Sequence, residues 1–189
     1  MVYEPRYIRN KEKTSANDFF SDIKRTTLSE ALIDHNKIVL LGNPGIGKST
    51  ELNILKTQLL ELHKSDEYYP LFIDLKNYRS KHKIEDLNTD KNWISHNKVC
   101  LIFDGIDETP DIQDFVSDLD VLFNKYSEKD IKTVISCRTN IYEKYLINID
   151  AFEYFFLDGL TDLQINTILK KKINKQLNLN ELNNLRVYL

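Results

Sequence analysis

Apolar and polar residues alternate along this chain in blocks that favour buried strands separated by amphipathic helices. Four short apolar runs have the composition of strands buried on both faces, at 37–41, 69–75, 99–103 and 133–136. Between them, apolar residues recur at helical spacing, in Leu52, Leu55, Leu59 and Leu62 and again in Ile112, Phe115, Val116, Leu119, Leu122 and Phe123. Strands that alternate with helices up to about residue 160 predict an α/β fold with a parallel sheet.

The segments outside this alternating core divide the chain. Residues 1–26 are predicted to form a polar N-terminal arm. The capping-box signature from Thr27 to Glu30 predicts a short helix just before the first strand. We expect residues 27–175 to form one domain and residues 176–189 to be the start of a truncated helical segment.

Composition describes an ordinary globular protein of a size that forms one domain, with 189 residues, 41% hydrophobic and 29% charged. No apolar stretch is long enough to cross a bilayer, and the first residues lack the apolar core of a signal peptide. These features predict a cytoplasmic protein without a membrane partner. The formal net charge of -3 does not support nucleic-acid binding, and the basic run Lys170-Lys171-Lys172 is expected to be a solvated helix face.

The densest cluster of glycines lies between the first apolar run and the first helical pattern. The residues Gly42-Asn43-Pro44-Gly45-Ile46-Gly47-Lys48-Ser49-Thr50 form a Walker A motif, or P-loop, in the required order of strand, loop and helix. Such a loop points backbone N–H groups at a polyphosphate, and the following helix adds its positive dipole end. Lys48 is placed to reach the β and γ phosphates, and the Ser49 hydroxyl to ligate Mg²⁺. A chance match in a glycine-rich turn is the alternative, which the flanking strand and helix disfavour.

A second candidate motif follows the third apolar run, where the chain reads Asp104-Gly105-Ile106-Asp107-Glu108. An aspartate that ends a buried parallel strand lies at the sheet edge where ligands bind, so Asp104 is predicted to hold Mg²⁺ as a Walker B residue. Asp107 or Glu108 is predicted to orient or deprotonate the attacking water. The alternative is an acidic turn that caps the helix beginning near Pro110.

Arg138 follows the fourth apolar run and should therefore project from the same sheet edge. Its fork of donors suits phosphate oxygens, which predicts contact with the γ-phosphate. The alternative is a salt bridge with Asp107 or Glu108, and the two roles do not exclude each other.

Several residues that often carry chemistry are expected to be structural. The polar stretch 76–97 shows no clear periodicity and is expected to be a loop that can include a short helix. Trp93 within it is expected to pack in the core and to have no functional role. Cys100 and Cys137 lie on neighbouring strands about 13 Å apart, too far for a disulfide, which predicts buried reduced thiols. The histidines lack ligand spacing, so any metal should come with the nucleotide; they are His35, His63, His82 and His96.

Together, the Walker A segment, the strand that ends at Glu108 and the strand that ends at Arg138 resemble the nucleotide-binding domain of the NACHT group of STAND NTPases. The Asp-Gly-x-Asp-Glu form of Walker B is the most specific of the three. Residues 155–160 and the capping box at 161–164 are similar to the fifth strand and next helix of that family, and the likeness covers roughly residues 37–175. The segment Tyr7-Ile8-Arg9 resembles the part of the family that lines the adenine pocket.

The resemblance implies a P-loop NTPase sandwich of three layers, with a parallel sheet of about five strands flanked by helices. It also implies a signalling switch that is closed with ADP, open and self-associating with ATP, and reset by slow hydrolysis. In microbes such switches serve antiphage defence, and the Lys- and Asn-rich composition hints at an AT-rich microbial genome. The family's small helical and winged-helix domains are not found in this sequence, so they are expected on another polypeptide or on a longer chain.

Two other functions remain open at this point. An AAA+-type motor or loader would turn ATP over rapidly and take an arginine from a neighbouring subunit. A nucleotide-stabilised scaffold would retain ADP without useful turnover. A small-molecule kinase is disfavoured, because the acids after Asp104 suit water activation better than binding of an acceptor. The chain lacks the guanine-reading Asn-Lys-x-Asp motif, which favours adenine.

Overall fold

The computed structural model describes residues 4–11, 26–62, 67–79, 81, 83–87, 90–145, 149 and 151–170. The predicted helical segment 176–189, most of the predicted arm and two lysines of the basic run lie outside the described residues.

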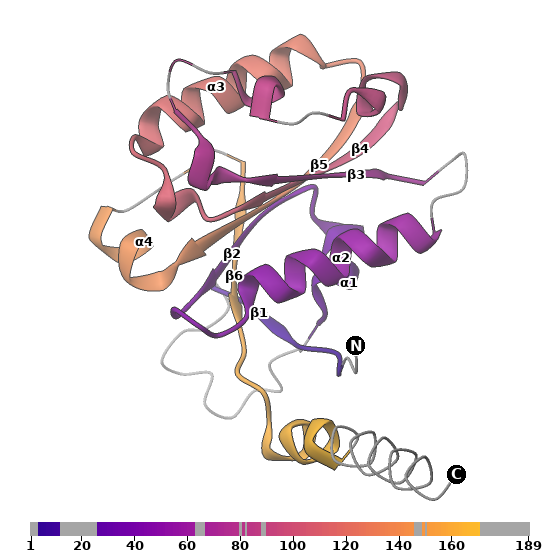
Figure 1. Ribbon diagram of the computed structural model, residues 1–189, viewed down its shortest axis with the longest axis vertical. Helices are drawn as coiled ribbons and strands as arrows, with labels where there is room; N and C mark the ends of the chain where they lie inside the picture. Colours follow the sequence, from indigo (N-terminus) through magenta and orange to yellow (C-terminus); the bar gives the residue numbers. More distant parts are fainter. Residues whose placement is uncertain are drawn as a thin grey trace, which may run out of the picture.

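A six-stranded sheet forms the middle layer of the molecule (Figure 1). Its strands are β1 (Ile8–Asn10), β2 (Lys37–Gly42), β3 (Tyr69–Asp74), β4 (Lys98–Asp104), β5 (Asp130–Arg138) and β6 (Glu153–Leu157). They lie side by side in the order β1-β6-β2-β5-β4-β3. All neighbouring pairs from β6 to β3 are parallel, and β1 pairs antiparallel with β6. Strand β5 therefore separates the strand before the P-loop from the strand that ends at Asp104.

Helices cover both faces of the sheet. The α-helices are α1 (Leu28–Asp34), α2 (Lys48–Leu62), α3 (Ile112–Lys125) and α4 (Thr139–Tyr145), and a further helix spans 162–170. Figure 1 shows α1 and α2 on one side of the sheet and α3 on the other. The buried side chains follow this division, because alternate residues of β2 face opposite sides: Ile38 packs in one cluster with Leu32 of α1, and Val39 in the other with Phe115 of α3. The predicted three-layer α/β architecture with about five parallel strands is confirmed.

The short antiparallel strand β1 was not predicted. It lies within the segment expected to be a polar arm, yet its Ile8 is 1% exposed and pairs with Leu157 at the sheet edge. The sheet therefore has six strands rather than about five. A strand of three residues with one apolar position is too short to show a periodic pattern. Its pairing partner also lies far away in the sequence, so no local signal indicates the pairing.

The polar stretch between β3 and β4 contains three short 3-10 helices, η2 (Leu75–Asn77), η3 (Ile84–Leu87) and η4 (Asn92–Ser95). Trp93 in η4 is completely buried in the hydrophobic cluster beneath α3, which confirms its packing role. The stretch therefore covers one face of the sheet.

Both cysteines are buried free thiols, as predicted. Cys100 lies opposite Lys132 of β5, whereas Cys137 lies further along β5, opposite Leu41 of β2. The two residues belong to hydrophobic clusters on opposite faces of the sheet. Burial raises the pKa of each thiol to about 12, so both are protonated and unreactive near neutral pH. Within the described ranges, no helix combines the length and apolar character needed to cross a bilayer.

Candidate nucleotide site

The carboxyl ends of β2, β4 and β5 meet at a cavity of about 290 Å³. The parallel sheet places this edge where ligands of such folds bind. Residues from all three predicted segments line the cavity: Pro44, Gly45, Gly47, Lys48, Ser49, Thr50, Asp104, Gly105, Asp107, Glu108, Ser136 and Arg138. Of the predicted phosphate-binding residues, Gly42, Asn43 and Ile46 are not among its lining residues, and they contribute to the loop through their backbones.

Three backbone donors at the start of α2 have no partner within the helix. The first bond of the helix runs from the Glu51 N–H to the Gly47 carbonyl at 3.1 Å, so the N–H groups of Lys48, Ser49 and Thr50 precede the helical ladder. Gly47 has a φ of +102°, a conformation that side chains disfavour, and a Cβ there would lie 2.7 Å from Nη1 of Arg6. The loop therefore needs glycine at this position, and its donors are available for an anion at the positive end of α2.

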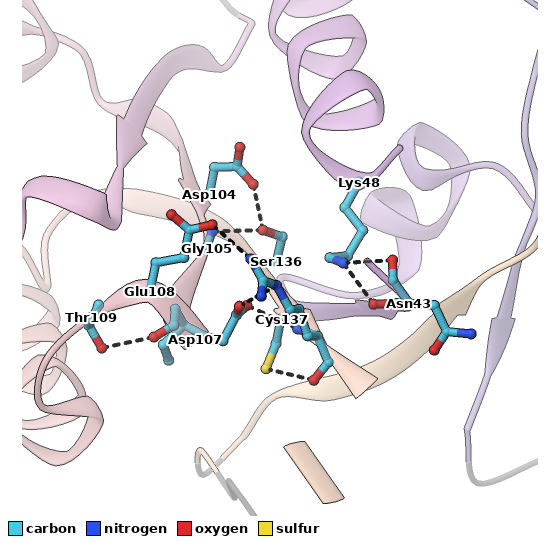
Figure 2. A network of polar contacts seen from close by, with 12 residues as sticks. Asn43, Lys48, Asp104, Gly105, Asp107, Glu108, Thr109, Ser136 and Cys137 are labelled. Atoms are coloured by element: carbon cyan, nitrogen blue, oxygen red, sulfur yellow. Dashed lines mark hydrogen bonds and ion pairs between the residues drawn. The ribbon is translucent and has the colours of Figure 1, made fainter. Parts of the chain in front are cut away.

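Lys48 bends back over the P-loop. Its Nζ donates to the carbonyl of Gly42 at 2.7 Å and to that of Asn43 at 3.3 Å. Figure 2 shows the ammonium group of Lys48 turned toward the Asn43 backbone. Partial burial lowers the pKa of Lys48 below its ordinary value, while the negative charge of Asp107 acts in the opposite direction. The ammonium group thus sits at the cavity with only neutral carbonyls as recorded hydrogen-bond partners among the described residues. A phosphate would supply the missing negative charge.

Asp104 and Gly105 are both tied to Ser136 (Figure 2). The Ser136 hydroxyl donates to Oδ1 of Asp104 at 2.6 Å, and the Gly105 N–H donates to the same hydroxyl at 2.8 Å. Gly105 has a φ of +82°, which turns the chain sharply after β4 into the 3-10 helix η5 (Ile106–Glu108). Sequence reasoning missed Ser136 as a site residue, although it is a polar residue in an apolar strand two positions before Arg138.

Arg138 contacts both acids of η5. Its backbone N–H donates to Oδ1 of Asp107 at 3.0 Å, and its Nε lies 3.0 Å from Oδ2 of the same carboxylate. Nη2 lies 3.3 Å from Oε1 of Glu108. The side chain of Asp107 is 3% exposed, whereas those of Arg138 and Glu108 are each 43% exposed. Both carboxylate oxygens of Asp107 therefore contact Arg138. Glu108 lines the cavity and makes one longer contact, with Nη2 of Arg138. The predicted alternative of a salt bridge is confirmed.

The donor set at this edge fits Mg²⁺. Ser49 and Asp104 line the same cavity and offer a hydroxyl and a carboxylate, and Mg²⁺ prefers oxygen ligands and is usually bound together with substrate phosphates. Across the part of the chain that the structure describes, no group of three or more His, Cys, Asp or Glu side chains could hold a metal ion. The protein would thus contribute few ligands of its own, and phosphate oxygens would complete the shell.

Arg6 links the N-terminal segment to the P-loop through a hydrogen bond to the Ile46 carbonyl. This residue was not predicted from the sequence. It is 8% exposed, and its guanidinium donates to the carbonyls of Ile46 in the P-loop and Asp158 after β6. Nearby, Nε of Arg9 lies 2.5 Å from Oδ1 of Asp158, so Arg9 forms an ion pair. Ile8 is buried within β1, whereas Tyr7 is 36% exposed. The role predicted for this segment at the adenine remains a prediction.

Replacing Arg6 with Met is expected to lower the free energy of unfolding by about 2 kcal/mol, because two partly buried carbonyls lose a charged donor. Urea denaturation measures this effect. Arg79→Met is the matched control, since Arg79 is exposed and, among the described residues, its hydrogen bonds go to carbonyls close to it in sequence. Equal stability of the two variants would show that Arg6 does not secure the P-loop.

No family model and no curated protein sequence matches the chain. Among solved structures, it is similar to the cytoplasmic domain of the type VII secretion ATPase EccC of Thermomonospora curvata, with a TM-score of 0.48 and 11% identity over 74% of this chain and 21% of that chain. A protein described as an ATPase gives a TM-score of 0.42 and 9% identity, over 74% of its length and 83% of this chain. This chain thus spans about one fifth of the EccC chain. At such low similarity, neither likeness bears on activity. The sheet order, the P-loop that follows β2 and the acidic end of β4 together give this chain the P-loop NTPase fold.

Proposed function

We propose that this chain binds ATP and ADP together with Mg²⁺ and hydrolyses ATP. The observation that carries this proposal is a single cavity of about 290 Å³ that brings together Lys48, Asp104, Glu108 and Arg138, from three segments far apart in the sequence. A cation, a metal-binding carboxylate, a candidate base and an arginine are the groups that phosphoryl transfer to water uses.

The nucleotide phosphates would occupy the P-loop. Backbone N–H groups at the start of α2 would bind their oxygens, and Nζ of Lys48 would exchange its two carbonyl contacts for the β and γ phosphates. Ser49 and Asp104 would hold the Mg²⁺, which neutralises charge on the phosphates when it is bound. These groups would orient the substrate and stabilise the negative charge that develops as the bond from the γ-phosphorus to its bridging oxygen breaks and ADP leaves.

Glu108 is the better of the two candidate acids for activating water. Both oxygens of Asp107 are held by Arg138, and its side chain is buried, so it is placed to position the arginine. Glu108 is far more exposed and has one contact of 3.3 Å, with Nη2 of Arg138. The Glu108 carboxylate would accept a proton from the attacking water, while Arg138 would contact the γ-phosphate with the outer nitrogens of its guanidinium.

At a finer level, we propose a slowly hydrolysing signalling switch of the NACHT/STAND type, with a role in microbial antiphage defence. The form of the acidic motif and the position of Arg138 in the cavity support this assignment. Self-association or further helical domains would provide its partners. Helix 162–170 supports that view, because Leu163, Ile165 and Leu169 are exposed at 78%, 40% and 49%.

The test is to measure tightly bound nucleotide and phosphate release for the purified chain with Mg²⁺. Slow phosphate release with bound ADP is the expected result for a hydrolysing switch. A rate that rises steeply with protein concentration or with added DNA would favour an AAA+-type motor. Retained ADP with no phosphate release would indicate a nucleotide-stabilised scaffold. Failure to bind either nucleotide would show that the proposal is wrong.

A further inference from the structure

Ser136 occupies a central position between the two nucleotide motifs. It is 1% exposed, belongs to β5, and lies opposite Leu40 of β2 in the parallel register. On its other side, the register of β5 with β4 runs to the pair of Phe103 and Ile135, which brings Ser136 beside the end of β4. A hydroxyl at this place reaches the residues that follow the apolar part of β4.

The direction of both Ser136 hydrogen bonds is fixed by the chemistry of its partners. A backbone N–H can only donate, so the Gly105 N–H must use a lone pair of the Ser136 oxygen, at 2.8 Å. An ionised carboxylate can only accept, so the single hydroxyl proton must point at Oδ1 of Asp104, at 2.6 Å. The Ser136 hydroxyl therefore has one orientation, in which it accepts from Gly105 and donates to Asp104. It joins the turn after β4 to the carboxylate that ends the strand.

The hydrogen bond from Ser136 occupies one carboxylate oxygen of Asp104 and leaves the other available to a ligand. Oδ1 is held by Ser136, whereas the second oxygen points away from Ser136 (Figure 2) and has no recorded partner among the described residues. The same turn places the candidate base, because the Glu108 N–H donates to the Gly105 carbonyl at 2.9 Å. One buried hydroxyl thus sets the orientation of the carboxylate and anchors the turn that carries Glu108.

We propose that Ser136 is a positioning residue for Mg²⁺: by holding Oδ1 of Asp104, it directs Oδ2 toward the ion that accompanies the nucleotide. The inference rests on the proposed function of this site. It assigns a role in binding to a residue that does not itself touch the substrate. A locked carboxylate loses less freedom when the ion arrives, which raises the affinity for Mg²⁺.

A purely structural role makes a different prediction from a positioning role. If Ser136 only stabilised the turn at Gly105, its removal would weaken nucleotide binding equally with and without Mg²⁺. If it positions Asp104, binding without Mg²⁺ should be nearly unchanged, and the gain that Mg²⁺ brings should be lost. The two roles are therefore separated by Mg²⁺ dependence and not by stability.

The experiment titrates the chain with a fluorescent ADP analogue in EDTA and over a range of Mg²⁺ concentrations. Ser136→Ala removes the hydroxyl, and Ser136→Cys keeps a side chain of similar shape with a weak donor, in case the alanine variant does not fold. Thr133→Val is the matched control. Thr133 lies on the same strand, is completely buried, and its hydroxyl has no hydrogen-bond partner among the described residues.

For both Ser136 variants we expect the Mg²⁺ concentration at half-maximal effect to rise about tenfold, with affinity in EDTA within about twofold of wild type. Thr133→Val should follow wild type in both conditions. Unchanged Mg²⁺ dependence in Ser136→Ala or Ser136→Cys, or an equal loss with and without Mg²⁺, would overturn the role of Ser136 and leave the proposed function intact. Failure of wild type to bind the analogue would overturn both.

Discussion

Lys48→Ala is expected to lower the affinity for ADP and ATP by at least about 100-fold. The lysine is the one cation that the P-loop carries, and its Nζ already lies over the loop on the carbonyls of Gly42 and Asn43. Because the lysine is partly buried, water would compete less for its charge with a phosphate than it does on the open surface. Equilibrium titration with a fluorescent ADP analogue in the presence of Mg²⁺ measures the change.

Lys56→Ala provides the control for this loss. Lys56 belongs to the same helix, α2, but its Nζ lies 5.6 Å from the ring centroid of Phe72 and is not among the groups that line the cavity. Its removal should leave nucleotide affinity unchanged within about twofold. If both lysine variants bound ADP as tightly as wild type, the cavity would not be the nucleotide site.

Glu108→Gln is expected to lower the rate of phosphate release by about 100- to 10,000-fold while nucleotide binding is retained. Glutamine has almost the same shape but cannot accept a proton from water. The Glu108 side chain is 43% exposed at the cavity, and among the described residues its one ion pair is the 3.3 Å contact with Arg138, so its loss should disturb the remaining site little. Single-turnover phosphate release and ADP titration together measure the two effects.

Asp107→Asn is the matched comparison for Glu108→Gln, because it neutralises the neighbouring carboxylate. Asp107 accepts from the backbone N–H and from Nε of Arg138, so this variant should loosen the arginine and lower phosphate release by about tenfold. Normal turnover in Glu108→Gln together with complete loss in Asp107→Asn would assign water activation to Asp107.

Much of the fold followed from local patterns. The four apolar runs became β2, β3, β4 and β5 because strands of a parallel sheet covered on both faces need apolar residues at nearly every position. Strand β1 could not be predicted in this way. It has three residues, and its pairing with residues 155–157 joins segments that lie far apart in the chain.

The candidate site was predictable where strand topology alone brings residues together. Asp104 and Arg138 end neighbouring parallel strands, so their meeting follows from the sheet. Ser136 carried a weak local signal as a polar residue in an apolar strand, but its hydrogen bonds depend on the register of β5 with β4. Arg6 gave no local signal, because its contact with the P-loop depends on the antiparallel pairing of β1 with β6.

The two edges of the sheet restrict how copies of this domain can associate. At one edge β1 is only three residues long, and at the other β3 carries Pro70, which has no N–H to donate to an incoming strand. Within the described residues, neither edge strand offers a long, unbroken row of donors and acceptors to another chain. Such edges disfavour edge-to-edge pairing, so assembly of this domain is expected to use its helices and loops and not a sheet shared between copies.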